Sequence, residues 1–148
     1  MRYEVKPVTD DMIAKCAAIF ETVFAMPPWS ENWKHEDAFQ RIYDIYSTKN
    51  SINLACFDNG EIVGCLFGVL YKWHSGHQFE IKEFFVCAKL QGRGIGKTIL
   101  HKLESSLSEM GSVEIFLQTL THDNAIYFYK NQNYTIKSNY SIMGKVIK

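Results

Sequence analysis

The stretch QGRGIGKT, residues 91–98, decides how the rest of this sequence is interpreted. It follows HQFEIKEFFVCA, residues 77–88, which is typical of a strand, and it leads into a run of apolar residues at helical spacing. Glycines in such a turn let backbone N–H groups converge on an anion at the positive end of the helix. We therefore expect a phosphate-binding turn, with a glycine turn that merely enters a helix as the structural alternative.

Two familiar nucleotide motifs do not fit this stretch. A P-loop, G-x-x-x-x-G-K-S/T, would match Gly96-Lys97-Thr98, but Gln91 stands where its first glycine belongs. The next strand-like segment, residues 113–119, also ends without the aspartate that would hold magnesium. A Rossmann turn, G-x-G-x-x-G, would need glycine where Lys97 or Ile99 stands. Both motifs fail, whereas a pyrophosphate still suits the turn.

Composition indicates one globular domain spanning residues 1–148 and argues against several classes of partner. The 148 residues are 47% hydrophobic and have no formal net charge, so we expect no binding to nucleic acid. The longest apolar run, residues 62–71, is too short to cross a membrane, and we expect no signal peptide. Four cysteines without a C-x-x-C pair predict reduced thiols, no metal site and a cytoplasmic protein.

The N-terminal half is predicted to hold a strand, two helices and a hairpin. We expect the strand in residues 2–9 and the second helix to be capped by Ser30. The expected apolar face of that helix is Phe39, Ile42, Tyr43 and Tyr46. A hairpin over residues 51–73 turns at Asn59-Gly60, which places Cys56 opposite Val63.

The C-terminal half is predicted to continue with a strand, the glycine loop and a helix, then a strand and a short helix. One or two closing strands are expected within residues 134–147. The fold class is therefore α/β (α+β), in the order β-αα-βββ-α-β-α-ββ. This order corresponds to a mixed, mostly antiparallel sheet of six to seven strands with four helices.

Gln91-x-x-Gly94-x-Gly96 resembles the acyl-CoA signature Q/R-x-x-G-x-G/A of the GNAT N-acetyltransferase superfamily. The predicted order of elements matches that family over nearly the whole chain, and NAIYFYKNQNY, residues 124–134, is similar to its later helix motif. Two positions depart from the family pattern. His122 stands where many members have the asparagine of that motif, and Asn133-Tyr134 replaces a Gly-Phe pair.

This resemblance implies an N-acetyltransferase that uses acetyl-CoA as co-substrate and needs no metal. It implies that the thioester carbonyl meets a backbone N–H at a bulge in the strand before the loop, which maps to Phe85, Val86 and Cys87. It also implies that Tyr129 protonates the leaving thiolate, whereas Tyr127 lies on another face of the helix. The residues implied to bind acetyl-CoA are Phe85, Val86, Cys87, Gln91, Gly92, Arg93, Gly94, Ile95, Gly96, Lys97, Thr98, Asn124 and Tyr129.

The general base has three candidates. Alternation along the strand places Glu83 in an apolar row with Phe79, Ile81 and Phe85, where burial would raise its pKa and suit it to proton abstraction. Glu80 falls on the opposite face, although the spacing of the base in some family members reaches it and a β-bulge would reverse the parity. The third candidate is a water molecule. A salt-bridged or solvated strand residue is the structural alternative for each acid.

The acceptor is expected to be a primary amine of a small molecule or peptide. Trp29 and Trp33 are candidate substrate contacts, and the acidic side chains between residues 21 and 44 favour a cationic amine. A solvated helix face is the alternative explanation for most of these charges. The alternative function is a catalytically silent acyl-CoA-binding regulatory domain, and either a monomer or a homodimer is compatible with the sequence.

Overall fold

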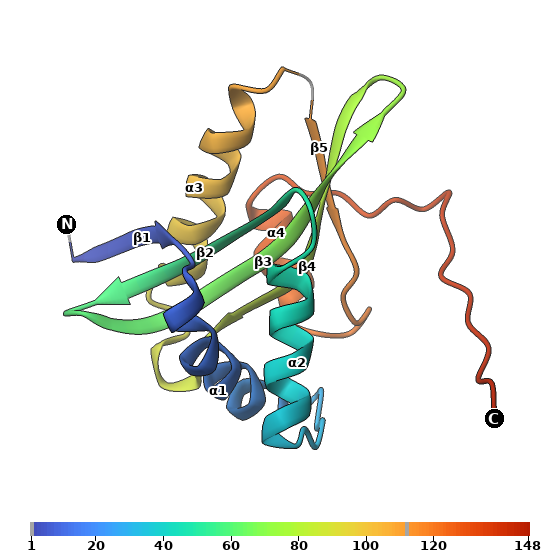
Figure 1. The fold of residues 1–148 in the computed structure, drawn as a ribbon. Helices are drawn as coiled ribbons and strands as arrows, with labels where there is room; N and C mark the ends of the chain where they lie inside the picture. Colours follow the sequence, from blue (N-terminus) through green and yellow to red (C-terminus); the bar gives the residue numbers. More distant parts are fainter. Residues whose placement is uncertain (1, 112) are drawn as a thin grey trace. The chain divides into compact units, whose positions relative to one another are not determined.

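Five strands form one mixed sheet in the computed structural model, which describes residues 2–111 and 113–148 (Figure 1). The sheet belongs to the first of two units, Met1–Gln118, and the second unit is Thr119–Lys148. The strands are β1 (Tyr3–Pro7), β2 (Ser51–Asp58), β3 (Glu61–Trp73), β4 (Gly76–Val86) and β5 (Val113–Leu117). They lie in the order of their numbers, and every neighbouring pair is antiparallel except the parallel pair β4 and β5.

Three α-helices cover the two faces of this sheet. They are α1 (Ile13–Phe24), α2 (His35–Tyr46) and α3 (Ile95–Ser108), with short 3₁₀ turns at Asp10–Met12 and Ala88–Leu90. Helices α1 and α2 pack on one face around Phe20, Ile42 and Phe67, and α3 lies against the other face (Figure 1). The close approach of α3 depends on Gly64, because a Cβ added there would lie 3.1 Å from the side chain of Ile99.

The β2–β3 hairpin has the predicted turn but a shifted register. Asn59 and Gly60 have φ angles of 52° and 79°, as a type I′ turn requires. A β-bulge leaves Val63 as an extra residue in β3, so Cys56 lies opposite Gly64 instead of Val63. The prediction for Cys56 was wrong because a two-residue turn fixes the register only as far as the first bulge.

A second β-bulge, in β4, changes which side chains share a face of the sheet. The pairs Phe67–Glu83 and Gly68–Ile81 leave Lys82 as the extra residue. The predicted apolar row was therefore wrong, because Glu83 lies on the face covered by α1 and α2 while Ile81 lies on the opposite face.

Helix α2 differs from its prediction in both its start and its buried face. It begins at His35, so Ser30 lies in the preceding turn, where its φ of 49° is left-handed, and does not cap the helix. The buried residues of α2 are Ala38, Ile42 and Ile45. Phe39 and Tyr43 are instead 40% and 43% exposed and stack on each other, with ring centroids 6.0 Å apart. The buried stripe of α2 thus contains Ala38 and Ile45 where the prediction had Phe39 and Tyr46, and it shares only Ile42 with the predicted face.

The second unit contains one helix, α4 (Ala125–Asn131), which brings the number of α-helices to the predicted four. After α4 the chain turns at Asn133, whose φ is 69°, and the N–H of Tyr134 donates to the carbonyl of Tyr129 at 3.0 Å. Residues 135–148 are exposed and form no strand. The predicted six to seven strands were thus wrong, and the described sheet has five. An alternating pattern forms a strand only where a neighbouring strand accepts its hydrogen bonds.

Candidate functional site

The pairing between β4 and β5 stops before β4 ends and opens one edge of this strand. The last parallel pair joins Ile81 to Leu117, so residues 82–86 pair with no further strand on that side among the described residues. Backbone groups on an unpaired edge are available to an extended ligand. This open edge leads directly into the glycine-rich loop.

Val86 directs its backbone groups toward the open edge. On the side of β4 that faces β3, the N–H of Cys87 donates to the carbonyl of Val63 at 2.9 Å. Phe85, two residues earlier and opposite Cys65, directs its backbone groups toward β3 as well. Backbone groups alternate between the two sides of a strand, so the intervening Val86 faces away from β3. The side-chain amide of Gln91 donates to the carbonyl of Val86 at 3.1 Å, as this orientation requires. The bulge of β4 lies at Lys82 and not at the predicted trio Phe85, Val86 and Cys87. Within the trio, Val86 is the residue whose backbone groups face the open edge, and cofactor binding by the three residues stays a prediction.

The predicted phosphate loop is a turn with two left-handed glycines. Gly92 and Gly94 have φ angles of 82° and 85°, and α3 begins directly afterwards at Ile95. A Cβ added to either glycine would meet no atom within 4 Å, so the backbone faces open space. In the described ranges no side-chain hydrogen bond caps α3, so a capping side chain does not occupy the first N–H groups of the helix. The Thr98 hydroxyl donates back to the carbonyl of Gly94 at 2.8 Å.

The side chains of the loop differ in what they offer to a ligand. Arg93 and Lys97 are exposed and give the loop two positively charged side chains. Ile95 is only 1% exposed and packs into the core beneath α3. Any contribution of Ile95 to a bound anion is therefore limited to its backbone N–H.

The Glu83 side chain is largely buried, and its ion-pair partner bonds only one of its two carboxylate oxygens. Nε and Nη2 of Arg41, on α2, donate to Oε2 of Glu83 at 3.0 and 2.9 Å. Burial raises the pKa of Glu83 above its ordinary value, although the charge and hydrogen bonds of Arg41 lower it, and the charge of Glu31 raises it further. Because both bonds end on Oε2, Oε1 is the atom that can accept a proton. Arg41 was missed as a site residue, since no local pattern links positions 42 residues apart.

Glu80 lies on the same face of the sheet as Glu83, so the predicted separation of the two acids was wrong. The bulge at Lys82 reverses the parity of β4, which places Glu80 opposite Val69 and Glu83 opposite Phe67 of β3. Glu80 pairs with Lys82 at 2.9 Å, and this short-range ion pair is typical of a structural strand residue.

The two tryptophans predicted to contact the acceptor pack against core rings. Trp33 lies edge-on to Phe20 with ring centroids 5.0 Å apart, and Trp29 lies edge-on to Phe24 at 5.4 Å. The indole N–H of Trp33 donates to Glu31 at 2.8 Å. These contacts hold the segment between α1 and α2 against the sheet, and acceptor binding by the tryptophans stays a prediction.

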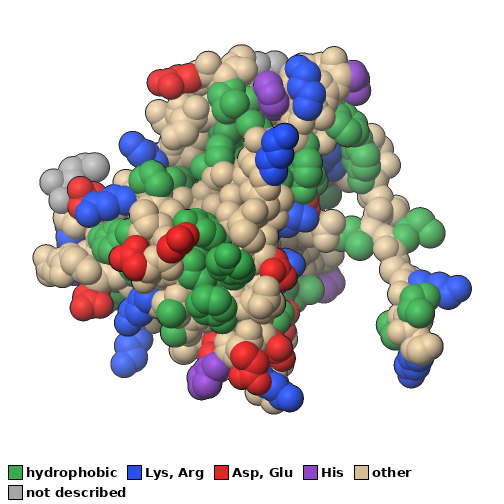
Figure 2. Space-filling model, viewed as in Figure 1, with side chains coloured by type: hydrophobic (Ala, Val, Ile, Leu, Met, Phe, Trp, Pro, Cys, Tyr) green, Lys and Arg blue, Asp and Glu red, His purple; other side chains and the backbone are tan. Residues whose placement is uncertain are grey.

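Acidic side chains gather over the beginning of α2, at the bottom of Figure 2. Glu36 and Asp37 occupy the first turn of α2, where negative charge stabilises a helix. Nδ1 of His35 lies 2.6 Å from the carboxylate oxygen Oε2 of Glu21, which is on α1. These acids thus have local structural roles, and together they make the surface over the beginning of α2 negative.

Tyr129, the predicted acid, lies on α4 in the second unit. Burial and the charge of Asp123 raise its pKa well above the ordinary value, so the phenol keeps its proton at neutral pH. Its ring packs against Phe128 and Tyr134, with centroids 5.2 and 5.6 Å apart. Tyr127 is 65% exposed and lies on another face of the helix, as predicted.

Asn124 stands at the position before α4, and its backbone carbonyl accepts the N–H groups of Tyr127 and Phe128 at 3.1 and 3.3 Å. Its side chain makes no capping hydrogen bond within the described part of the chain. Contact between Asn124 and the cofactor stays a prediction.

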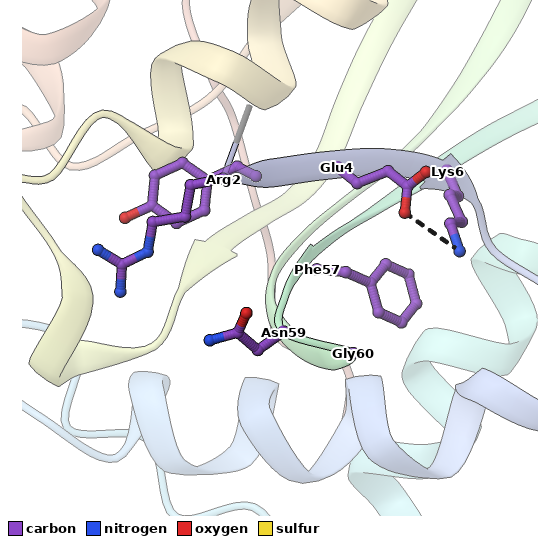
Figure 3. Close-up of a pocket in the computed structure, with 7 residues that line it drawn as sticks. Arg2, Glu4, Lys6, Phe57, Asn59 and Gly60 are labelled. Atoms are coloured by element: carbon purple, nitrogen blue, oxygen red, sulfur yellow. Dashed lines mark ion pairs between the residues drawn. The ribbon is translucent and has the colours of Figure 1, made fainter.

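A separate hollow lies at the β1 edge and the turn between β2 and β3 (Figure 3). Its lining residues are Arg2, Tyr3, Glu4, Lys6, Phe57, Asn59 and Gly60. Glu4 and Lys6 form an ion pair at 3.3 Å, and Arg2 pairs with Asp58 at 3.0 Å. The hollow shares no residue with the open edge of β4 or the glycine loop, and its charged side chains are engaged in these two ion pairs. We therefore take the open edge of β4 and the loop as the candidate site.

Among the residues that the structure describes, no group of three or more His, Cys, Asp or Glu side chains could hold a metal ion. None of the described helices is long and apolar enough to cross a membrane.

The sequence pattern of the acetyltransferase (GNAT) family matches residues 19–134, which include the open edge, the loop and α4. The chain belongs to the acetyltransferase (GNAT) family. No curated protein sequence matches this GNAT chain.

Solved structures share the GNAT fold at low sequence identity. A protein from Clostridium difficile 630 described as a possible acetyltransferase has a TM-score of 0.84 at 12% identity and covers 100% of both chains. An aminoglycoside acetyltransferase from an uncultured soil metagenomic sample has a TM-score of 0.77 at 20% identity, covering 99% of this chain and 97% of its own. A transcriptional regulator from Bacillus halodurans C-125 has a TM-score of 0.78 at 15% identity, covering 98% and 99%. At these identities the likeness establishes the fold alone.

Proposed function

We propose that this GNAT protein transfers an acetyl group from acetyl-CoA to a primary amine. The observation that carries the proposal is the continuity of two features in one unit. The open edge of β4 at Val86 runs directly into the uncapped glycine loop of residues 91–98. An extended chain ending in a pyrophosphate needs both an unpaired strand edge and an anion-binding turn, in this order.

The residues of the loop and strand fit acetyl-CoA chemically. Backbone N–H groups around Gly92, Gly94 and Gly96 would bind the pyrophosphate, and Arg93 and Lys97 would add positive charge. The N–H of Val86 faces the open edge and would polarise the thioester carbonyl by donating to its oxygen.

Acyl transfer also requires that the amine lose a proton and that the leaving thiolate gain one. In the proposed reaction the amine nitrogen bonds to the carbonyl carbon and the carbon–sulfur bond breaks. Oε1 of Glu83 takes the proton of the amine, directly or through water, because Arg41 holds the other oxygen. Tyr129 donates a proton to the thiolate, and its raised pKa keeps this proton in place until charge develops on sulfur.

A cationic amine is the proposed class of acceptor. The acidic surface over the beginning of α2 supports this proposal, because it would attract a positively charged substrate toward the helix pair. An aminoglycoside acetyltransferase shares this fold, and aminoglycosides are polyamines.

The test is an amine-panel assay that measures free thiol released from acetyl-CoA and the mass of the product. The panel contains an aminoglycoside, a linear polyamine, a lysine peptide and matched alcohols that lack the amine. The proposal expects thiol release that depends on at least one amine, with one added acetyl group per thiol. The alcohols should give only the background rate of hydrolysis.

A regulatory domain is the second candidate, because a transcriptional regulator shares the fold. The same assay separates the two functions. Binding of acetyl-CoA without amine-dependent thiol release across the panel would favour the regulator. Failure to bind acetyl-CoA at all would exclude both.

A further inference from the structure

Two cysteines that the proposed reaction does not use face each other in the core of the first unit. Cys16 lies on α1 and Cys65 on β3, 49 residues later in the chain, and both side chains are fully buried. The thiol of Cys65 donates a hydrogen bond to Sγ of Cys16, and the two sulfur atoms are 3.4 Å apart. The sulfur atoms of a disulfide are about 2.05 Å apart, so an approach of roughly 1.4 Å would join the two side chains.

The register of the sheet separates this pair from the other two cysteines. Cys56 is one residue along β2 from the position opposite Cys65, so its side chain projects from the other face of the sheet. Cys87 stands two residues beyond Phe85, which lies opposite Cys65 on β4. Such diagonal neighbours have Cα atoms roughly 7–8 Å apart, which is more than a disulfide spans. Cys16 is therefore the partner that Cys65 can reach.

Burial determines how these thiols react. Burial and the hydrogen bond with Cys16 raise the pKa of the Cys65 thiol well above its ordinary value, so little thiolate forms at neutral pH. The pair therefore stays reduced in the absence of a strong oxidant. A bulky or charged disulfide cannot reach side chains that solvent does not contact, whereas hydrogen peroxide is small and uncharged and can enter when α1 opens locally.

We propose that Cys16 and Cys65 are a hydroperoxide-sensitive dithiol whose reversible disulfide joins α1 to β3. In the first step one sulfur attacks the peroxide and becomes a sulfenic acid, and one water leaves. The second sulfur then displaces the hydroxyl group of the sulfenic acid, so the sulfur–sulfur bond forms and a second water leaves. The two thiols together lose two electrons and two protons, and these convert hydrogen peroxide to two waters. A small dithiol such as dithiothreitol reverses the change by thiol–disulfide exchange.

Formation of the disulfide fixes α1 on the sheet. Phe20 and Phe24 of α1 lie edge-on to Trp33 and Trp29, so the same bond restrains the segment between α1 and α2. The bond also links residues 49 positions apart, which restricts the unfolded chain. We therefore expect oxidation to raise the melting temperature by about 5–15 °C, and dithiothreitol to restore the original value.

The test treats the full-length protein with hydrogen peroxide, alkylates the remaining thiols under denaturing conditions and maps the peptides without reduction. The proposal expects a linked pair of peptides that contain Cys16 and Cys65, with Cys56 alkylated. The same map is made for Cys87→Ser, which removes the partly exposed thiol and should leave the link in place. Dithiothreitol should convert the linked pair back to two alkylated cysteines.

Two matched variants test the effect on stability. Cys16→Ser and Cys56→Ser each replace one fully buried thiol, and circular dichroism checks their folds. The rise in melting temperature on oxidation should disappear in Cys16→Ser and persist in Cys56→Ser. The peptide map of the parent decides the pairing even where a variant fails to fold. Alkylated Cys16 and Cys65 after peroxide treatment, a link to a different cysteine, oxidation that dithiothreitol does not reverse, or an unchanged melting temperature would each overturn the proposal.

Discussion

Arg41 and burial shift the pKa of Glu83 in opposite directions. Burial raises the pKa of this carboxyl, and the charge of Arg41 and its hydrogen bonds to Oε2 partly offset the increase. If Glu83 is the base, only its carboxylate form is active, so kcat/KM should rise as the pH increases through the raised pKa. Removing Arg41 takes away a group that lowers this pKa. We therefore predict that Arg41→Ala moves the acidic limb of the pH profile of kcat/KM to higher pH.

The conservative variants separate this effect from loss of packing. Arg41→Lys keeps a positive charge and should move the limb less than Arg41→Ala does. Glu83→Gln should abolish the limb and lower kcat by roughly 10²–10⁴-fold, the range for loss of a positioned base. An unchanged pH profile in Arg41→Ala, or parental turnover in Glu83→Gln, would assign the proton to water.

A second prediction concerns Tyr129, the proposed proton donor to the leaving thiolate. Tyr129→Phe keeps the ring and its contacts with Phe128 and Tyr134 but deletes the hydroxyl. The proposed acid acts mainly as charge develops on sulfur, so kcat should fall by roughly 10²–10⁴-fold while acetyl-CoA affinity changes little. Steady-state kinetics and calorimetric titration measure the two quantities.

Tyr127 is the control, because it lies on the same helix and is 65% exposed. Tyr127→Phe should be nearly silent in both measurements. A Tyr129→Phe enzyme with parental kcat on its true acceptor would remove the hydroxyl from the mechanism and leave the ring as a packing element.

Among the elements, β4 does most to position the site, and its bulge depends on a glycine in the neighbouring strand. Gly68 lies at the register shift, and a Cβ added there would come within 2.5 Å of the carbonyl oxygen of Glu80 and of the Phe79 ring. Gly68→Ala must therefore displace backbone or a buried ring. We predict a loss of about 1–3 kcal/mol in the free energy of unfolding, measured by urea denaturation.

Gly144→Ala is the control for this change, since an added Cβ there meets no atom within 4 Å. It should alter the free energy of unfolding by less than about 0.5 kcal/mol. Equal stability of Gly68→Ala and the parent would mean that the bulge tolerates a side chain and that its position is set elsewhere.

The same bulge shows which parts of the fold could be predicted from sequence. The Asn59-Gly60 turn could be predicted from the sequence, as could the succession of a strand, the glycine loop and a helix. Both depend on turn residues and periodicity, which are properties of neighbouring residues. The face of Glu83 was mispredicted, because one extra residue at Lys82 reverses every later position. Gly68, a glycine inside an apolar strand, was the available signal for that bulge.

The remaining errors also came from interactions between distant elements. The contact between Arg41 and Glu83 depends on how α2 docks on the sheet, and the closing strands depend on a pairing partner that alternation alone does not supply. Ser30 has the residue type of a helix cap, but the chain takes a further turn before α2 begins.

At the scale of the whole molecule, membership of the GNAT family and the geometry of the loop both support the proposal that acetyl-CoA is the ligand. Both the enzyme and the regulatory alternative require acetyl-CoA at the loop of residues 91–98. The central claim is therefore that the backbone of this loop binds the pyrophosphate, and a negative charge placed there should prevent binding.

The most direct test is the melting temperature of the parent, Gly94→Asp and Gly111→Asp, each with and without acetyl-CoA. The two glycines have nearly the same φ, 85° and 87°, and both face open space, so the substitutions are matched in backbone strain and charge. Gly111 follows α3, at the end away from the loop. Acetyl-CoA at about 100 times its Kd should stabilise the parent and Gly111→Asp by about 2.7 kcal/mol and leave Gly94→Asp unchanged. A parent whose melting temperature does not respond to millimolar acetyl-CoA, or a Gly94→Asp variant that responds equally, would contradict the account.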